Sequence, residues 1–196
     1  VKNSFFPPSN TPMFYLDYWR FQGSDIRATQ QDVVEIEQYL LKQGHVVDVT
    51  STIGQGAPRF MLSYAPEKAY AAFAQLIIRV NDREDLTPTM KALRNFMSQN
   101  MLNAEFKIKR MQLGPATDAK IEARFSGPDP TVLKELAHQA KQVLRADAGA
   151  HNIKDDWRDR TKVIRPQIND QKARRLGISK SDVDQLLLTS FSGKQV

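Results

Sequence analysis

The 196-residue sequence contains no cysteine. This absence excludes disulfide frameworks, thiolate nucleophiles and zinc sites built on cysteine. Long apolar runs are also absent, because the most apolar stretch, residues 71–78, is interrupted by Gln75 and is far shorter than the roughly 20 residues that cross a bilayer. The sequence opens with Val1-Lys2-Asn3 and no signal-peptide-like apolar segment, so we interpret it as an internal segment of a larger protein.

Patterns that carry catalysis or hold metals are missing as well. The three histidines, His45, His138 and His151, have no second histidine or carboxylate at zinc-ligand spacing, which indicates surface histidines. No serine stands in a Gly-x-Ser-x-Gly elbow. The densest charge cluster, residues 155–160, mixes aspartates with arginines and is typical of a solvated ion-pair network. We therefore expect no enzymatic activity, no cofactor and no metal.

The composition predicts a folded protein with a basic second half. Hydrophobic residues make up 41% of the sequence and aromatic residues 9%, enough for a buried core. The net charge is +6; residues 1–103 carry 10 basic and 10 acidic residues, whereas residues 104–196 carry 18 basic against 12 acidic. A basic half is compatible with nucleic-acid binding, but without clustering it is more typical of ordinary solubility.

Strands and helices alternate along the first half. Residues 13–19 are aromatic-rich and predict a strand, followed by a helix that Thr29 caps and Gly44 ends, and by a strand over residues 46–53. After a long loop, the pattern predicts a strand over residues 74–80, a helix opened by Thr87-Pro88, and a strand over residues 104–113.

The second half begins the same order again. We expect a strand over residues 119–126, a helix opened by Asp129-Pro130, two strands near residues 152–157 and 162–169, and a last helix that Ser179 caps with Asp182 as capping-box partner. The fold class is therefore α+β, with two ferredoxin-like (split βαβ) units of which the second lacks its final strand. A doubly wound parallel sheet is the less favoured alternative, because strand pairs separate the helices and a Gly-rich phosphate loop is missing.

The loop after the second strand is the most suggestive segment for function. It comprises Ile53, Gly54, Gln55, Gly56, Ala57, Pro58, Arg59 and Phe60. A phosphate cradle is disfavoured, because a third glycine and a helix start do not follow. Long loops on a rigid sheet are usually functional or disordered, so binding or gating and a plain excursion both remain open.

Nucleic-acid binding is the alternative function, because one ferredoxin-like version, the RNA-recognition motif, stacks bases on aromatic residues of its sheet. Its signature is absent from both candidate third strands, residues 74–80 and 162–169, and the second of these has no aromatic residue. A ferredoxin-like nucleic-acid-binding module therefore stays the runner-up.

Three motifs resemble the porter region of resistance-nodulation-division (RND) efflux transporters. Phe6-Pro7-Pro8 before a hydrophobic strand that ends at Gly23 resembles the start of that family's second large periplasmic loop. Leu113-Gly114-x-Ala116-Thr117 resembles the join between two porter subdomains. The longest motif, Asp170-x-x-Ala173-x-x-Leu176-Gly177-Ile178-Ser179-x-x-Asp182-Val183, resembles the family's strand-to-helix passage in the second subdomain.

The resemblance implies a domain organisation and a setting. Residues 1–9 would be a membrane-proximal lead-in, residues 10–115 the first porter subdomain, and residues 116–196 the first part of the second. It implies a periplasmic loop of an inner-membrane homotrimer of the hydrophobe/amphiphile type, driven by protons, working with a periplasmic adaptor and an outer-membrane channel in multidrug and acriflavin resistance. The partners would be small amphiphilic substrates and no nucleic acid.

The resemblance also implies a site. Residues 53–60 occupy the place of the family's Gly-rich switch loop, and the two glycines would permit the backbone changes of a gate. Phe106, Ile108, Gln112 and Lys154 are expected to line the adjoining cleft. This loop departs from the Phe-rich loops of multidrug members through Gln55, Pro58 and Arg59, which suggests amphiphiles that tolerate negative charge.

Overall fold

A computed structural model describes residues 9–61, 63–112, 114, 119, 121–147, 149–150, 153–157, 163 and 165–193. The predicted lead-in over residues 1–9 lies outside this range except for Ser9, and the predicted join around residues 113–117 does so except for Gly114. The chain divides into two compact units, residues 1–161 and 162–196. The subdomain boundary near residue 115 stays a prediction.

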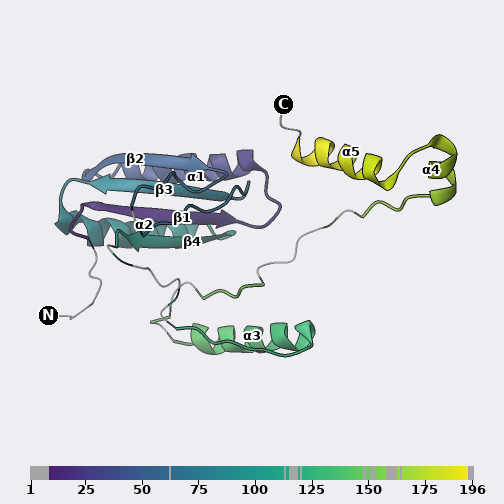
Figure 1. The fold of residues 1–196 in the computed structure, drawn as a ribbon. Helices are drawn as coiled ribbons and strands as arrows, with labels where there is room; N and C mark the ends of the chain where they lie inside the picture. The colour runs from purple at the N-terminus through teal and green to yellow at the C-terminus, as the bar shows by residue number, and fades with distance from the viewer. Residues whose placement is uncertain are drawn as a thin grey trace. The chain divides into compact units, whose positions relative to one another are not determined.

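A four-stranded antiparallel sheet with two helices dominates the first unit (Figure 1). Its elements are β1 (Met13–Arg20), α1 (Ile26–Leu41), β2 (Val46–Ile53), β3 (Phe73–Val80), the 3-10 turn η1 (Arg83–Asp85), α2 (Leu86–Asn100) and β4 (Ala104–Arg110). The strand order is β2-β3-β1-β4, and every neighbouring pair is antiparallel. This βαββαβ order is the split βαβ arrangement, so the α+β prediction is confirmed.

Both helices of this sheet begin earlier than the sequence predicts. Asp25, not Thr29, caps α1, because its carboxylate accepts a hydrogen bond from the Arg27 backbone N–H at 2.7 Å. The Thr29 side chain is buried instead and donates to the Ala71 carbonyl at 2.9 Å. In α2, Thr87 and Pro88 lie inside the first turn, after a start at Leu86. Thr29, which the sequence predicts as the cap, therefore lies inside α1 and ties this helix to the loop before β3.

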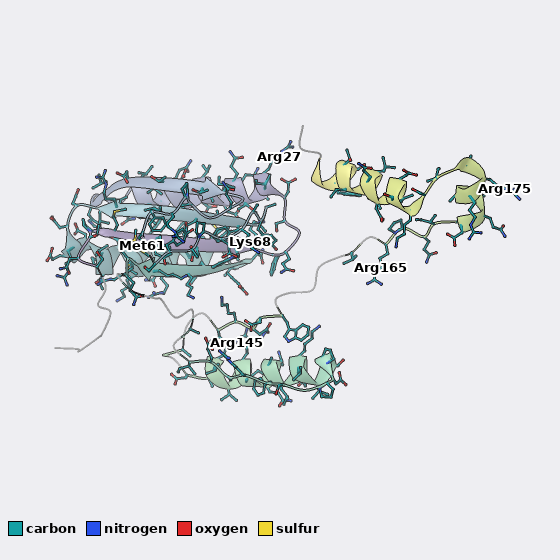
Figure 2. All side chains as sticks on the ribbon, in the orientation of Figure 1. Arg27, Met61, Lys68, Arg145, Arg165 and Arg175 are labelled. Atoms are coloured by element: carbon teal, nitrogen blue, oxygen red, sulfur yellow. The ribbon has the colours of Figure 1, made fainter. Side chains whose placement is uncertain are left out.

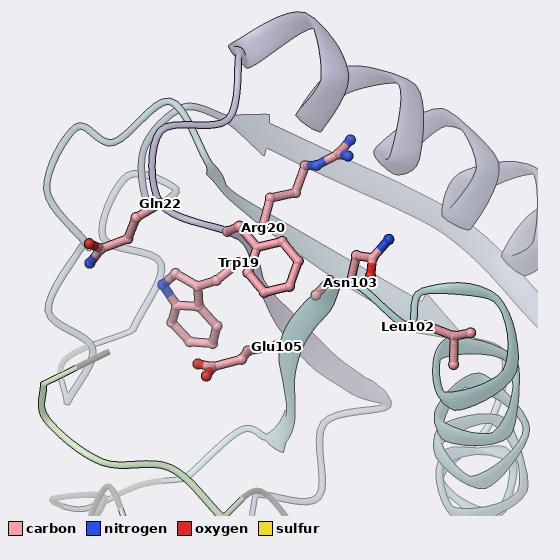
Figure 3. A pocket seen from close by; sticks show the side chains of 8 residues that line it. Trp19, Arg20, Gln22, Leu102, Asn103 and Glu105 are labelled. Carbon is pink, nitrogen blue, oxygen red and sulfur yellow. The ribbon is translucent and has the colours of Figure 1, made fainter. Parts of the chain in front are cut away.

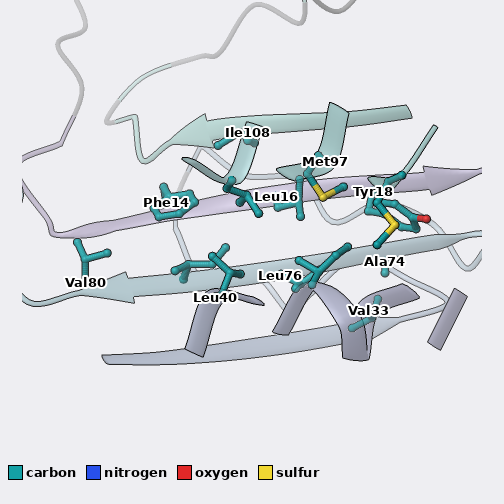
Figure 4. Packing of buried hydrophobic residues seen from close by; sticks show 14 of the residues in the cluster. Phe14, Leu16, Tyr18, Val33, Leu40, Ala74, Leu76, Val80, Met97 and Ile108 are labelled. Atoms are coloured by element: carbon teal, nitrogen blue, oxygen red, sulfur yellow. The ribbon is translucent and has the colours of Figure 1, made fainter. Parts of the chain in front are cut away.

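The hydrophobic core lies between the two helices and one face of the sheet (Figure 4). Alternate strand residues reach this face, and both helices contribute residues at helical spacing. The fully buried members include Phe14, Leu16, Tyr18, Val33, Ile36, Leu40, Leu76, Ile78, Leu93 and Met97. Burial of each large side chain stabilises the fold by about 1.5–3 kcal/mol. Because neighbouring strand residues point to opposite faces, Tyr15, Asp17 and Trp19 lie on the face that the helices leave uncovered.

One polar group enters the helix-covered face of β1. The Tyr18 hydroxyl donates to the Asp32 carboxylate of α1, which also forms an ion pair with the Arg20 guanidinium at 2.9 Å. Burial, reinforced by the Asp32 carboxylate, raises the pKa of Tyr18 far above its ordinary value. This tyrosine therefore acts as a hydrogen-bond donor that fixes the end of β1 against α1.

The second half of the chain contributes three helices among the residues that the structure describes: α3 (Pro130–Arg145), α4 (Asp170–Leu176) and α5 (Lys180–Ser192). The predicted caps are confirmed, since Asp129 accepts from the Thr131 N–H at 2.7 Å and Ser179 and Asp182 form the capping box. The Ser179 hydroxyl donates to the Asp182 carboxylate at 2.7 Å and lowers the pKa of that carboxyl. None of the helices in the described ranges combines the length and apolarity that a bilayer crossing needs.

The strands predicted at residues 119–126, 152–157 and 162–169 are wrong for the residues of these segments that the structure describes, none of which lies in a strand. A strand is stable only when a neighbour completes its hydrogen-bond ladder and covers its apolar face. Ile121, Phe125 and Val163 are exposed instead of packed. In the described residues, only the first ferredoxin-like unit therefore has a sheet.

Candidate functional site

A long loop between β2 and β3 lies against the sheet face opposite the helices. This loop, residues 54–72, is called the β2–β3 loop and includes Met61 and Lys68, labelled in Figure 2. Its Ala57 backbone N–H donates to the Gln75 side-chain oxygen at 3.0 Å, and the Tyr64 hydroxyl donates to the same oxygen at 2.8 Å. One carboxamide of β3 thus holds two separate points of the loop.

The same carboxamide connects the loop to an ion pair whose carboxylate is buried and whose ammonium is partly exposed. The Gln75 nitrogen donates to the Asp17 carboxylate at 2.7 Å, and the Lys109 ammonium lies 3.0 Å from the other carboxylate oxygen. Asp17 is only 5% exposed, and such a buried carboxylate is costly unless its oxygens are satisfied. Three strands, β1, β3 and β4, therefore contribute one residue each to a network that ends in the loop.

Burial keeps the loop's donor in the protonated form. It raises the pKa of the Tyr64 hydroxyl. Tyr64 therefore donates to Gln75 throughout the neutral range.

Three aromatic rings lie beside the network. Phe60 stacks on Tyr64 with centroids 4.4 Å apart, and Tyr15 meets Phe60 edge-on at 5.6 Å. The Lys109 ammonium lies 5.6 Å from the centroid of the Tyr15 ring. Tyr15, Phe60 and Tyr64, called here the aromatic trio, form a cluster between the sheet and the loop in which Tyr15 and Tyr64 are buried.

The two glycines of the loop are needed for different reasons. Gly54 has φ +82°, a left-handed conformation that glycine adopts readily. Its N–H donates to the Phe73 carbonyl and its carbonyl accepts from the Tyr70 N–H, each at 2.7 Å. Gly56 is needed for close approach, because a Cβ there would lie 2.4 Å from the Glu67 backbone nitrogen. Both N–H groups are engaged, since Gly56 donates to the Glu67 carbonyl at 3.0 Å. The glycines thus hold the loop in a shape that other residues cannot adopt.

The remaining predicted loop residues divide between packing and solvent. Ile53 ends β2 and packs against the core, and Ala57 is a buried residue of the loop. Gln55, Pro58 and Arg59 are exposed.

The predicted cleft residues do not gather in one place. Phe106 and Ile108 pair with Tyr18 and Leu16 across β4 and β1, so they share the helix-covered face, and Ile108 is 9% exposed in the core. Their apolar character reflects packing with the helices, and their neighbours on β4 face the loop instead. The Gln112 carbonyl accepts a hydrogen bond from the Ser63 hydroxyl at 2.9 Å, which ties the loop to the end of this strand.

Lys154 lies beside Trp19, on the sheet face that the helices leave uncovered. Its ammonium is 5.8 Å from the centroid of the Trp19 ring. Beside Trp19 is a cavity of about 170 Å³, lined by Trp19, Arg20, Phe21, Gln22, Leu102, Asn103, Ala104 and Glu105 (Figure 3). It lies where β1 ends and β4 begins, and it is called here the sheet-end pocket.

Sequence reasoning missed the residues that organise the site. Asp17, Tyr64, Gln75 and Lys109 form its network, yet none was a predicted site residue. One signal was present: Gln75 is a polar residue inside the most apolar strand of the sequence. A buried amide in such a strand requires partners, and those partners define the site. Among the described residues, no group of three histidine, aspartate or glutamate side chains is placed to hold a metal ion.

The split βαβ sheet with its long β2–β3 loop is consistent with a porter-type subdomain of RND efflux transporters. The sequence matches the AcrB/AcrD/AcrF family over residues 1–196, and the chain therefore belongs to this family of RND transporters. The resemblance of the three sequence motifs to RND efflux transporters is therefore confirmed at the level of the family.

Solved structures agree on the fold. Two crystal forms of a heavy metal efflux pump resemble the chain with TM-scores of 0.66 and 0.64, each at 13% sequence identity. The matches cover 96% and 95% of this chain but 20% of each pump, so the chain spans about a fifth of those proteins. At this identity the likeness shows the fold alone. A search of curated proteins finds no match.

Proposed function

We propose that the chain is a periplasmic substrate-handling part of a proton-driven RND pump, and that the whole protein exports amphiphilic toxic compounds. The observation that supports this most is the link from Gln75 to the β2–β3 loop, because it joins a movable cover to a rigid sheet. The aromatic trio and Lys109 supply the apolar and cationic contacts that an amphiphile with a negative group needs.

The loop would act as a gate between two positions. Leaving the sheet breaks two hydrogen bonds to Gln75 and the one from Ser63 to the Gln112 carbonyl, each contributing about 0.5–1.5 kcal/mol. It also loosens aromatic contacts of about 0.5–1.5 kcal/mol each. Opening would therefore cost a few kcal/mol, which leaves the open form a minor state that a ligand can stabilise. Substrate contact with Tyr15, which is buried while the loop lies on the sheet and would be uncovered by opening, would provide that differential binding.

The assembly in which this gate would work is taken from the resemblance to RND transporters. The whole protein would be an inner-membrane homotrimer with a periplasmic adaptor and an outer-membrane channel. Residues 10–115 would form one porter subdomain and residues 116–196 the first part of the next. The apolar residues exposed at Ile121, Phe125 and Val163 fit a second subdomain that other strands complete.

Export is tested in cells that express the full-length parent protein. Gln75→Leu removes the loop's attachment, and Gln55→Leu makes the same chemical change at an exposed position of the loop. Growth is measured on dyes, bile salts, detergents and heavy-metal salts. We expect Gln75→Leu to lose resistance to large amphiphiles while Gln55→Leu retains it. Resistance confined to metal salts, or equal resistance in both variants at equal expression, would show that the proposed cargo or gate is wrong.

A further inference from the structure

The attachment of the β2–β3 loop depends on which end of the Gln75 carboxamide faces it. The carboxamide oxygen accepts from the Ala57 N–H at 3.0 Å and from the Tyr64 hydroxyl at 2.8 Å. The carboxamide nitrogen donates to the Asp17 carboxylate at 2.7 Å. A flipped carboxamide exchanges its oxygen and its NH2 group but keeps nearly the same shape. Hydrogen-bond partners, and not packing, therefore have to select the orientation that holds the loop.

On the loop side, the Ala57 N–H makes this selection. A backbone N–H can only donate, whereas the Tyr64 hydroxyl can rotate and accept. A flipped carboxamide would place its NH2 group against the Ala57 N–H, so that two donors face each other. Ala57 is 3% exposed and Gln75 1% exposed, so bulk water does not replace the lost acceptor.

On the sheet side, Asp17 makes the same selection and carries a full charge. Its ionised carboxylate can only accept, and the Lys109 ammonium, which can only donate, lies 3.0 Å from the oxygen that Gln75 does not use. Donors and acceptors thus follow one direction from β4 through β1 and β3 to the loop. In a buried chain of this kind, each hydrogen bond polarises and strengthens the next.

We propose that Asp17 is the positioning residue of the gate, and that its negative charge fixes the Gln75 carboxamide in the orientation that holds the loop. In Asp17→Asn, the Lys109 ammonium would retain the side-chain oxygen and turn the new NH2 group towards Gln75. Three donors would then compete for the two acceptor sites of one carboxamide oxygen, and one donor would lose its partner. The closed position of the loop is therefore controlled by the charge of a residue that acts on it through Gln75.

The role of Asp17 in transport rests on the proposed gate, but its effect on the loop can be measured without transport. An unchanged loop in Asp17→Asn would overturn the positioning role and leave the export proposal standing. A released loop in this variant with normal export by the full-length protein would refute the gate alone. The two proposals can therefore fail separately.

The test is hydrogen exchange of the Ala57 amide, followed by NMR in the purified 196-residue chain. Asp17→Asn keeps the size of the side chain, and we expect it to speed this exchange by about 5- to 100-fold, as for a buried donor that loses its partner. Asp48→Asn makes the same change at an exposed carboxylate of β2 and should stay within about 2-fold of the unchanged chain. Equal rates in both variants, or a rise that all β3 amides share, would overturn the proposal.

A second substitution separates the orientation of the carboxamide from a general loss of charge or packing. In Asp17→Asn combined with Gln75→Glu, the carboxylate at position 75 accepts at both oxygens, so it can take the NH2 group at position 17 and both loop donors. The summed charge of the two positions is unchanged. We expect the Ala57 amide to exchange at least about 5-fold more slowly in this double variant than in Asp17→Asn. Exchange as fast as in Asp17→Asn would show that the direction of the hydrogen bonds does not hold the loop.

Discussion

Replacing Gln75 by leucine tests whether one carboxamide holds the β2–β3 loop on the sheet. The change removes the acceptor for the Ala57 N–H and the Tyr64 hydroxyl, both of which are buried. A buried donor left without a partner costs about 1–3 kcal/mol, so the two together predict a loss of roughly 2–6 kcal/mol. Asp17 also loses one donor but keeps Lys109 at 3.0 Å. Since domains are stable by about 5–15 kcal/mol, the protein should still fold.

The assay is urea unfolding of the purified 196-residue chain, with limited trypsin digestion beside it. Arg59 and Lys68 are exposed in the loop and provide cleavage sites that report its detachment. We expect Gln75→Leu to lower the free energy of unfolding by the stated amount and to speed cleavage at these two sites above all others. Gln55→Leu should stay within about 0.5 kcal/mol of the unchanged protein. If both variants unfold and digest alike, Gln75 does not hold the loop and the reasoning fails.

Three further predictions concern the loop glycines, the α5 cap and nucleic acids. Replacing Gly54 and Gly56 together by proline removes two N–H donors and forbids φ +82° at Gly54. The full-length protein should therefore lose resistance to large substrates while still assembling. Normal resistance to substrates of every size would contradict this. Ser179 lowers the pKa of Asp182, so the cap stabilises α5 at pH values above the ordinary carboxyl pKa and loses this contribution as the pH falls through the lowered pKa. Ser179→Ala should move the pKa of Asp182 upwards in an NMR titration. An unchanged pKa would argue against the hydrogen bond as the cause. Binding to RNA or DNA should be weak, independent of sequence and lost at physiological salt; submicromolar affinity that neutralising the two β4 lysines abolishes would favour the nucleic-acid alternative.

The first sheet could be predicted from the sequence because local and global preferences agree there. The aromatic-rich β1, the apolar β3 and the helical spacing of Val33, Ile36 and Leu40 all contribute to one core. The capping box at Ser179 was equally readable, since it depends only on residues three positions apart.

The remaining features depend on partners that a linear pattern does not show. The strand pattern around Phe125 needs a neighbouring strand to become a ladder, and the structure gives it none among the described residues. Phe106 and Ile108 were predicted for a cleft from their apolar character, but the β1 register decides the face of each residue and places both in the core. Gln75 becomes informative only when Asp17, 58 residues away, lies beside it.

The hydrogen bonds of the β2–β3 loop to Gln75 are local in sequence and span 18 and 11 residues, whereas those that join Ser63 to Gln112 and Ala71 to Thr29 span 49 and 42 residues. The helix-side core lies on the opposite face of the sheet and shares none of the bonds to Gln75. We therefore expect the cover, apart from its end at Ala71, which is bonded to Thr29 of α1, to detach without global unfolding. Closing so short a segment carries little loop-closure entropy, so re-formation should be fast compared with folding of the sheet. In hydrogen-exchange terms, the amides of residues 54–72 should open with a free energy well below that of the β3 amides beneath them.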